Sequence, residues 1–232
     1  SLKPGGGGVA LAPGQNLEAR NMELPSLSGN AQGRDYAAYL IGVERGFTQD
    51  MRTFIQKDLG AGAAVFCSQA SYGGLGGVWR EANLDMVDMH AYWQHPGFPN
   101  KAWDSNDYRI GNSAMIREGN GGTLPGLAMH RVAGLPFTVS EYDHPAPSEY
   151  AAESVPMIFA YAALQDWDGV FLFAYDGARR DKISGFFDMA AHSPKMAFLP
   201  AAAQIFLRGA VRPAASSQVL SVSKNRIADL TA

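Results

Sequence analysis

The sequence has very little cysteine and no long apolar run, and each absence excludes a class of protein. Cys67 is the only cysteine among 232 residues, so the chain can form neither an intrachain disulfide nor a zinc site built from several cysteines. It lies in the apolar segment AAVFCSQ, which predicts a buried, unreactive thiol. No segment approaches the roughly 18 apolar residues that a membrane-spanning helix needs, so we expect no membrane partner.

The chain also lacks an excess of positive charge and the glycine motifs of nucleotide-binding proteins. Its net charge is −3 and it has no basic cluster, whereas affinity for nucleic acid depends on neutralising phosphates. The sequence GGLGG at 73–77 has neither the spacing nor the following helix of a phosphate-binding loop. We therefore expect no nucleic-acid partner and no cofactor. The opening residues, SLKPGGGG, do not resemble a signal peptide, and the cellular compartment stays open.

The two ends of the chain differ in composition from its centre. Residues 1–34 are rich in Gly, Pro, Ser and Asn, which indicates an irregular arm with short strands at most at 8–12 and 16–24. Apolar residues then recur at helical spacing from 35 to 59, and Gly60 ends this predicted helix. Residues 210–232 form a tail that alternates like a β-hairpin turning at Lys224–Asn225.

The centre of the chain alternates between short apolar runs and helical segments. The runs lie at 63–69, 84–93, 135–142 and 169–177, and helices are predicted at 123–134, 148–167 and 193–209. Strands that are apolar on both faces and alternate with helices predict an α/β fold with a parallel sheet covered by helices. In such folds the functional residues gather at the carboxyl ends of the strands.

The predicted strand ends combine one carboxylate with a His/Tyr pair and several aromatic residues. The segment PFTVSEYDHP places Glu141 at the end of the third run, and VDMHAYW places His90 and Tyr92 at the end of the second. Sugar rings have apolar faces that lie on aromatic side chains and hydroxyl groups that need polar partners. A lone Glu among such groups suits the nucleophile of a glycosidase. The pattern therefore predicts a carbohydrate site.

Four segments resemble, in the same order, the C-terminal half of a retaining (β/α)8-barrel glycoside hydrolase of the cellulase-like clan, similar to family 5. They are VDMHAYWQHP, PFTVSEYDHP, YAALQDWDGVFLFAYDG and FLRG. The resemblance implies that Glu141 is the nucleophile at the end of barrel strand seven, and that His90 and Tyr92 on strand six orient it and the sugar. It also implies β-linked glycans or glycosides as substrates, and it is consistent with a secreted or periplasmic location. The side chains that we expect to contact the sugar are His90, Tyr92, Trp93, His95, Trp103, Tyr142, His144, Phe173 and Tyr175.

One part of that family's active site is missing here. Its members carry the acid/base as the Glu of an Asn–Glu pair that ends strand four, and this sequence contains no Asn–Glu dipeptide. Retaining hydrolysis needs two carboxyl groups about 5 Å apart. Asp88 shares a predicted strand with His90 and is therefore our predicted catalytic partner for Glu141. The other substitutes are Glu23, Glu44, Asp143 and Glu153.

Barrel strands one to four have no counterpart in the arm at 1–34. The resemblance therefore implies half of a TIM-type barrel at 35–209, with about four parallel strands and covering helices, followed by the β tail at 210–232. Such a sheet has two open edges, and open edges pair readily with other chains. We therefore expect a homodimer in which the two halves cover each other.

Three other interpretations stay open. The missing acid/base fits a non-catalytic carbohydrate-binding or oligomeric scaffold derived from such a barrel. An esterase could use Ser140 or Ser68 in the same pocket, although neither serine lies in a GxSxG motif. Asp88, His90 and His95 are residue types that ligate zinc or iron, but the sequence lacks a further well-spaced ligand, so we expect no metal.

Overall fold

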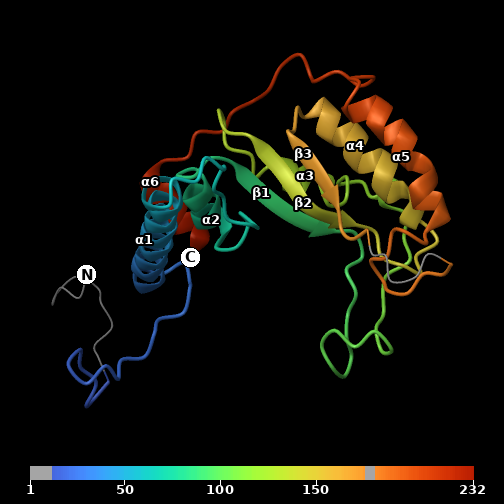
Figure 1. Ribbon diagram of the computed structural model, residues 1–232. Coiled ribbons are helices and arrows are strands. Elements are labelled where there is room, and N and C mark those ends of the chain that lie inside the picture. Colours follow the sequence, from blue (N-terminus) through green and yellow to red (C-terminus); the bar gives the residue numbers. More distant parts are fainter. Residues whose placement is uncertain (1–11, 176–180) are drawn as a thin grey trace. The chain divides into compact units, whose positions relative to one another are not determined.

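The computed structural model describes residues 12–175 and 181–232 and divides the chain into two compact units (Figure 1). One unit extends to Asp85 and includes Val219–Ala232, and the other is Met86–Gln218. The predicted strand at 8–12 lies almost entirely outside the described residues, as does the end of the predicted strand at 169–177. No helix in the described part of the chain is long and apolar enough to cross a membrane.

Three α-helices form the described part of the first unit. α1 (Ala31–Thr53) begins after Asn30, whose side chain accepts a hydrogen bond from the backbone N–H of Gly33, and continues as a π-helix, η1 (Phe54–Asp58). The helix predicted at 35–59 is thereby confirmed. α1 packs against α2 (Gly74–Glu81) and α6 (Lys224–Thr231). A Cβ at position 76 of α2 would lie 2.5 Å from Ile41 Cγ1, so Gly76 permits the close approach of α1 and α2.

Two predictions for residues 63–81 are wrong. The segment 63–69 is not a strand, because carboxylates take the backbone N–H groups that a neighbouring strand would need. Val65 donates to Asp85 Oδ2 at 2.8 Å, and Cys67 donates to Glu81 Oε2 at 3.1 Å. The GGLGG sequence at 73–77 was predicted to have no following helix, but α2 begins within it, at Gly74.

The short strand predicted at 16–24 is also wrong, because this segment forms turns and irregular structure.

The predicted C-terminal hairpin is also wrong, because α6 occupies its second half. Ser223 begins this helix by accepting a hydrogen bond from the backbone N–H of Arg226. Ile227 is then buried against the other helices, which a hairpin with an exposed turn at this place would not achieve. The alternating residues before it, including Val219 and Leu220, stay exposed and form no strand. The N-cap at Ser223 and the burial of Ile227 stabilise a helix here more than the alternating pattern of apolar residues stabilises a hairpin.

The second unit contains an open parallel sheet with strand order β1–β2–β3. The strands are β1 (Val87–Tyr92), β2 (Phe137–Asp143) and β3 (Gly169–Leu172). The helices are α3 (Leu124–Ala128) between β1 and β2, α4 (Ser154–Leu164) between β2 and β3, and α5 (Ser193–Phe206) after β3. The α/β class is therefore confirmed; the described residues form three parallel strands in place of the four predicted, and this part of the sheet does not close into a barrel.

One face of this sheet forms the core of the second unit. Phe137 and Val139 of β2 are fully buried, and Trp167, after α4, meets the Phe137 ring edge-on with 5.0 Å between centroids. Leu172 of β3 packs on a cluster that contains Val155 of α4 and Ala202 of α5. Figure 1 shows α4 and α5 side by side next to the sheet. The side chains that alternate with Phe137 and Val139 are polar, and Thr138 and Ser140 both donate hydrogen bonds to Asp88 of β1.

Candidate functional site

A β-bulge in β2 brings the polar side chains of the sheet to one face. The register pairs Met89 with Val139 but His90 with Glu141, so Ser140 is an extra residue. The pairing with β3 skips the same position. In a regular strand Ser140 and Glu141 would point to opposite faces. Because of the bulge, both side chains contact the side chain of His90.

Glu141 lies near the carboxyl end of β2 between the two side chains that the sequence places with it. The Tyr92 hydroxyl donates to Glu141 Oε2 at 2.5 Å, and His90 Nδ1 lies 3.4 Å from the same oxygen. Burial raises the pKa of Tyr92, and the nearby carboxylates of Glu141 and Asp143 raise it further, so Tyr92 remains a hydrogen-bond donor. The Glu141 side chain is 31% exposed, which leaves it within reach of a substrate.

Asp88 lies beneath this trio and is fully buried. Its two carboxylate oxygens accept hydrogen bonds of 2.5 Å from Thr138 Oγ1 and Ser140 Oγ. His90 Nε2 lies 2.9 Å from Ser140 Oγ and 3.5 Å from Asp88 Oδ2. A carboxylate in this place cannot reach a leaving group. In this position Asp88 anchors Ser140 and lies close to the imidazole ring of His90.

A buried ion pair fixes the end of β2. Lys195, in the first turn of α5, donates to both oxygens of Asp143 at 2.7 and 2.8 Å, and both side chains are fully buried. Burial raises the pKa of Asp143 to about 7, although Lys195 acts in the opposite direction. Burial also lowers the pKa of Lys195. This pair holds the strand end that follows Glu141 against α5.

Aromatic side chains cluster around Tyr92. Phe187 stacks on Tyr92 with 4.3 Å between ring centroids, and Phe173 meets the Tyr92 ring edge-on at 6.1 Å. His95 also meets Tyr92 edge-on, at 5.4 Å, and Trp103 lies 5.7 Å from His95. Phe173 and Trp103 are exposed. The cluster thus offers apolar surface close to the carboxylate that Tyr92 holds.

Other residues predicted to contact a sugar lie elsewhere. Tyr142 and His144 are fully buried, and the Tyr142 hydroxyl lies 2.9 Å from His144 Nε2. The strand returns to normal alternation after the bulge, which turns Tyr142 to the covered face, so both side chains lie away from the exposed carboxylate of Glu141. Burial lowers the pKa of His144 to about 3, which keeps it neutral. Trp93 donates through Nε1 to the backbone oxygen of Ser113, and Tyr175 is exposed after β3.

Sequence reasoning missed several residues that shape the site. Phe186 and Phe187 lie in a segment between the last predicted strand and helix, and the adjacent pair FF was the available signal. Lys195 had a signal as well, because a cation is unfavourable in the first turn of an otherwise apolar helix unless it has a partner. Ser140 could not be assigned its contacts, because nothing in the alternation of PFTVSEY marks the bulge.

The remaining substitutes for the acid/base have other partners or belong to the first unit. Glu153 accepts hydrogen bonds from the backbone N–H groups of Met115, at 2.8 Å, and Ile116. Glu23 and Glu44 belong to the first unit, where Glu44 pairs with Arg80 at 3.0 Å. Within residues 12–175 and 181–232, no group of three or more His, Cys, Asp and Glu side chains is arranged to hold a metal ion.

Comparison with protein-family models, curated proteins and solved structures found no match to this chain.

Proposed function

We propose that the second unit is a glycoside hydrolase that acts on β-linked glycosides with retention, through Glu141 as nucleophile. The observation that carries the proposal is the partly exposed carboxylate of Glu141, oriented by Tyr92 and His90 beside an aromatic surface. The hydrogen bond from Tyr92 and the proximity of His90 to the same oxygen fix the side chain and leave the other oxygen to attack. The resemblance of the four sequence segments supports the same role.

The reaction would follow two displacements at the anomeric carbon. A Glu141 oxygen forms an ester bond to this carbon while the bond to the leaving oxygen breaks, and that oxygen takes the electron pair. Water then attacks the glycosyl ester, releases the sugar and restores the carboxylate. Asp88, Asp143 and Glu153 are all bound by protein donors. We therefore expect turnover chiefly of substrates whose leaving group departs as a stable anion and needs no proton from an acid.

Aryl β-glycosides such as 2,4-dinitrophenyl β-glucoside and β-xyloside test this proposal, because their leaving groups need no acid. We expect Glu141→Gln to reduce turnover by about a thousandfold or more, since removal of a catalytic nucleophile has effects of this order. Glu149→Gln, at an exposed Glu in the loop after β2, is the matched control and should retain turnover. In Glu141→Ala, azide should restore cleavage and give a glycosyl azide of inverted configuration.

The outcomes separate the alternatives. Turnover that survives in Glu141→Gln contradicts the assignment of the nucleophile. Saturable binding of β-linked oligosaccharides, measured by calorimetry, with no turnover of activated glycosides supports the non-catalytic carbohydrate-binding scaffold.

One observation favours ester hydrolysis as a second candidate. Ser140 Oγ lies 2.9 Å from His90 Nε2, and Glu141 Oε2 lies 3.4 Å from His90 Nδ1, which is the order of a Ser–His–carboxylate set. Ser140 also donates to Asp88, which competes with transfer of its proton to His90. Hydrolysis of p-nitrophenyl acetate that is lost in Ser140→Ala supports this candidate, and hydrolysis unchanged in Ser140→Ala rules it out.

A further inference from the structure

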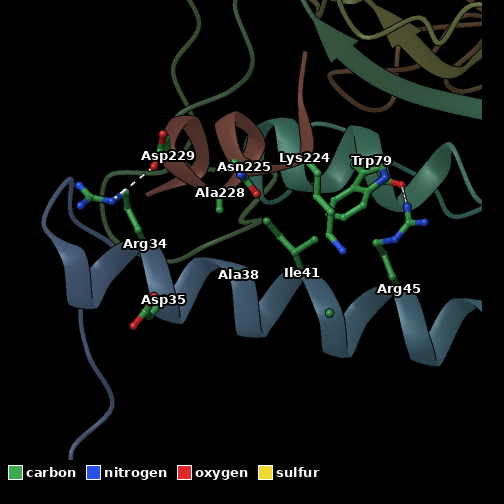
Figure 2. A pocket seen from close by; sticks show the side chains of 11 residues that line it. Arg34, Asp35, Ala38, Ile41, Arg45, Trp79, Lys224, Asn225, Ala228 and Asp229 are labelled. Carbon is green, nitrogen blue, oxygen red and sulfur yellow. Dashed lines mark hydrogen bonds and ion pairs between the residues drawn. The ribbon is translucent and has the colours of Figure 1, made fainter. Parts of the chain in front are cut away.

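The first unit contains a pocket between α1, α2 and α6 that is separate from the site on the sheet. Its volume is about 540 Å³, within the size range of small-ligand sites. Figure 2 shows its two ends: Arg34 and Asp229 lie at one end, and Trp79, Arg45 and Lys224 lie at the other.

Two cations meet at the indole ring of Trp79. The Arg45 guanidinium lies 4.2 Å from the ring centroid and Lys224 Nζ lies 5.5 Å from it. Arg45 also donates to the backbone oxygen of Trp79, which fixes its head group (Figure 2). Attraction to the ring offsets part of the repulsion between the two positive charges.

Neither cation has an acidic partner in the described part of the chain. None of the ion pairs found there includes Arg45 or Lys224. Burial lowers the pKa of Arg45, so its charge is partly removed from water without a compensating carboxylate. An anion between the two side chains would supply that compensation.

The carboxylates of the pocket are at its other end. Asp229 Oδ1 lies 3.3 Å from Arg34 Nε, and Asp229 Oδ2 lies 3.4 Å from Arg226 Nη1. Asp35 is also at this end (Figure 2). The pocket therefore has one positive end and one end at which charges are balanced.

We propose that this pocket binds a small molecule that carries a phosphate or sulfate group, with that group between Arg45 and Lys224. A guanidinium presents paired N–H donors to such an oxyanion, and an ammonium adds a point charge. The balanced end accommodates the uncharged, polar part of the ligand. This site is independent of glycoside hydrolysis, and its test involves no turnover.

Inorganic phosphate and inorganic sulfate are the probes. The indole N–H signal of Trp79, assigned by its loss in Trp79→Phe, is followed by NMR during titration at constant ionic strength, with chloride as the reference anion. We expect a saturable shift with a dissociation constant of about 1 mM. Lys224→Gln should weaken binding about fivefold, the scale expected when one of two charged contacts is lost.

Lys57→Gln is the matched control, because it removes one positive charge from the first unit outside the pocket. Its binding constant should equal that of the unmodified protein. Lys224 is exposed, so Lys224→Gln should unfold at the same temperature as the unmodified protein, which thermal unfolding checks. A shift that does not saturate, that chloride produces equally, or that Lys224→Gln and Lys57→Gln change to the same extent overturns the proposal.

Discussion

At the residue scale, burial shifts the pKa values of two side chains near the end of β2 in opposite directions. It raises the pKa of Asp143 to about 7 and lowers the pKa of His144 to about 3. The raised pKa of Asp143 contributes stability that is present below its unfolded pKa of about 3.9 and is lost as pH rises through 7. The lowered pKa of His144 contributes stability that is present above about 6.5 and is lost as pH falls through about 3. Lys195 is hydrogen-bonded to Asp143, so replacing Asp143 would also remove an ion pair. The contribution of His144 to the pH dependence of stability is therefore simpler to isolate.

Replacement of His144 should flatten the acid side of the stability profile. His144→Asn has no group to protonate, so the difference in free energy of unfolding between the unmodified protein and this variant should shrink from pH 6.5 towards pH 3. The total change is a few kcal/mol at most, since one pKa unit corresponds to about 1.4 kcal/mol. Urea unfolding at several pH values measures it. His130→Asn, which replaces a histidine whose Nδ1 lies 2.6 Å from the backbone oxygen of Gly126, is the control for loss of an imidazole ring elsewhere in the second unit. Parallel profiles for His144→Asn would show that this ring is not kept neutral by the fold.

At the element scale, the bulge in β2 is the feature that assembles the site. The residues on either side of the bulge stay on the buried face of the sheet, since Val139 and Tyr142 both point to the covered side. The single extra position therefore adds a polar side chain without disturbing the core. Both Ser140 and Glu141 then reach the side chains of β1.

Deletion of Ser140 should leave a folded protein with an impaired site. The shortened strand alternates regularly, with Glu141 opposite His90 and Tyr142 still covered, so circular dichroism should show an intact fold. Asp88 loses one hydrogen-bond partner while it remains buried, which costs about 1–3 kcal/mol of stability. Turnover of activated glycosides should fall further in the deletion than in Ser140→Ala, because only the deletion also straightens the backbone next to Glu141 and so shifts its carboxylate relative to Tyr92 and His90. Equal activity in the two variants would mean that the bulge has no role beyond supplying the hydroxyl.

The sequence predicts elements well where one local pattern decides them. The apolar runs before His90 and Glu141 are strands, and both residues meet with Tyr92 at the carboxyl end of the sheet. The sequence does not predict local structure where contacts with distant residues determine it. Cys67 lies in a strand-like run whose N–H groups bond to carboxylates, and Lys195 is stable only because Asp143 faces it. The bulge at Ser140 depends on pairing with two other strands, which no local pattern records.

At the scale of the whole molecule, the open sheet bears on association. Among residues 12–175 and 181–232, β1 and β3 each pair with β2 alone, and Phe171 of β3 is 60% exposed. Open edges and exposed apolar side chains favour contact with a second chain. The homodimer expected from the sequence therefore remains a prediction, with β3 as its specific contact.

Light scattering coupled to size exclusion tests this prediction. The protein should elute with twice the mass of one chain, and Phe171→Lys should shift the population towards the monomer by at least tenfold in dissociation constant, since burial of a Phe side chain contributes about 1.5–3 kcal/mol. Ile116→Lys, at an apolar residue outside the sheet that is 71% exposed, should leave the dimer unchanged. A stable monomer at all concentrations would contradict the prediction.

The ion pair between Asp143 and Lys195 also sets an order of events during synthesis. The two residues are 52 positions apart, so the ribosome must add 52 residues after Asp143 before its partner exists. At about 5–20 residues per second this takes roughly 3–10 seconds. Throughout that interval the nascent chain holds Asp143 without its cation, and an unpaired carboxylate resists burial. The strand that carries Glu141 therefore reaches its final state only after the first turn of α5 has left the ribosome.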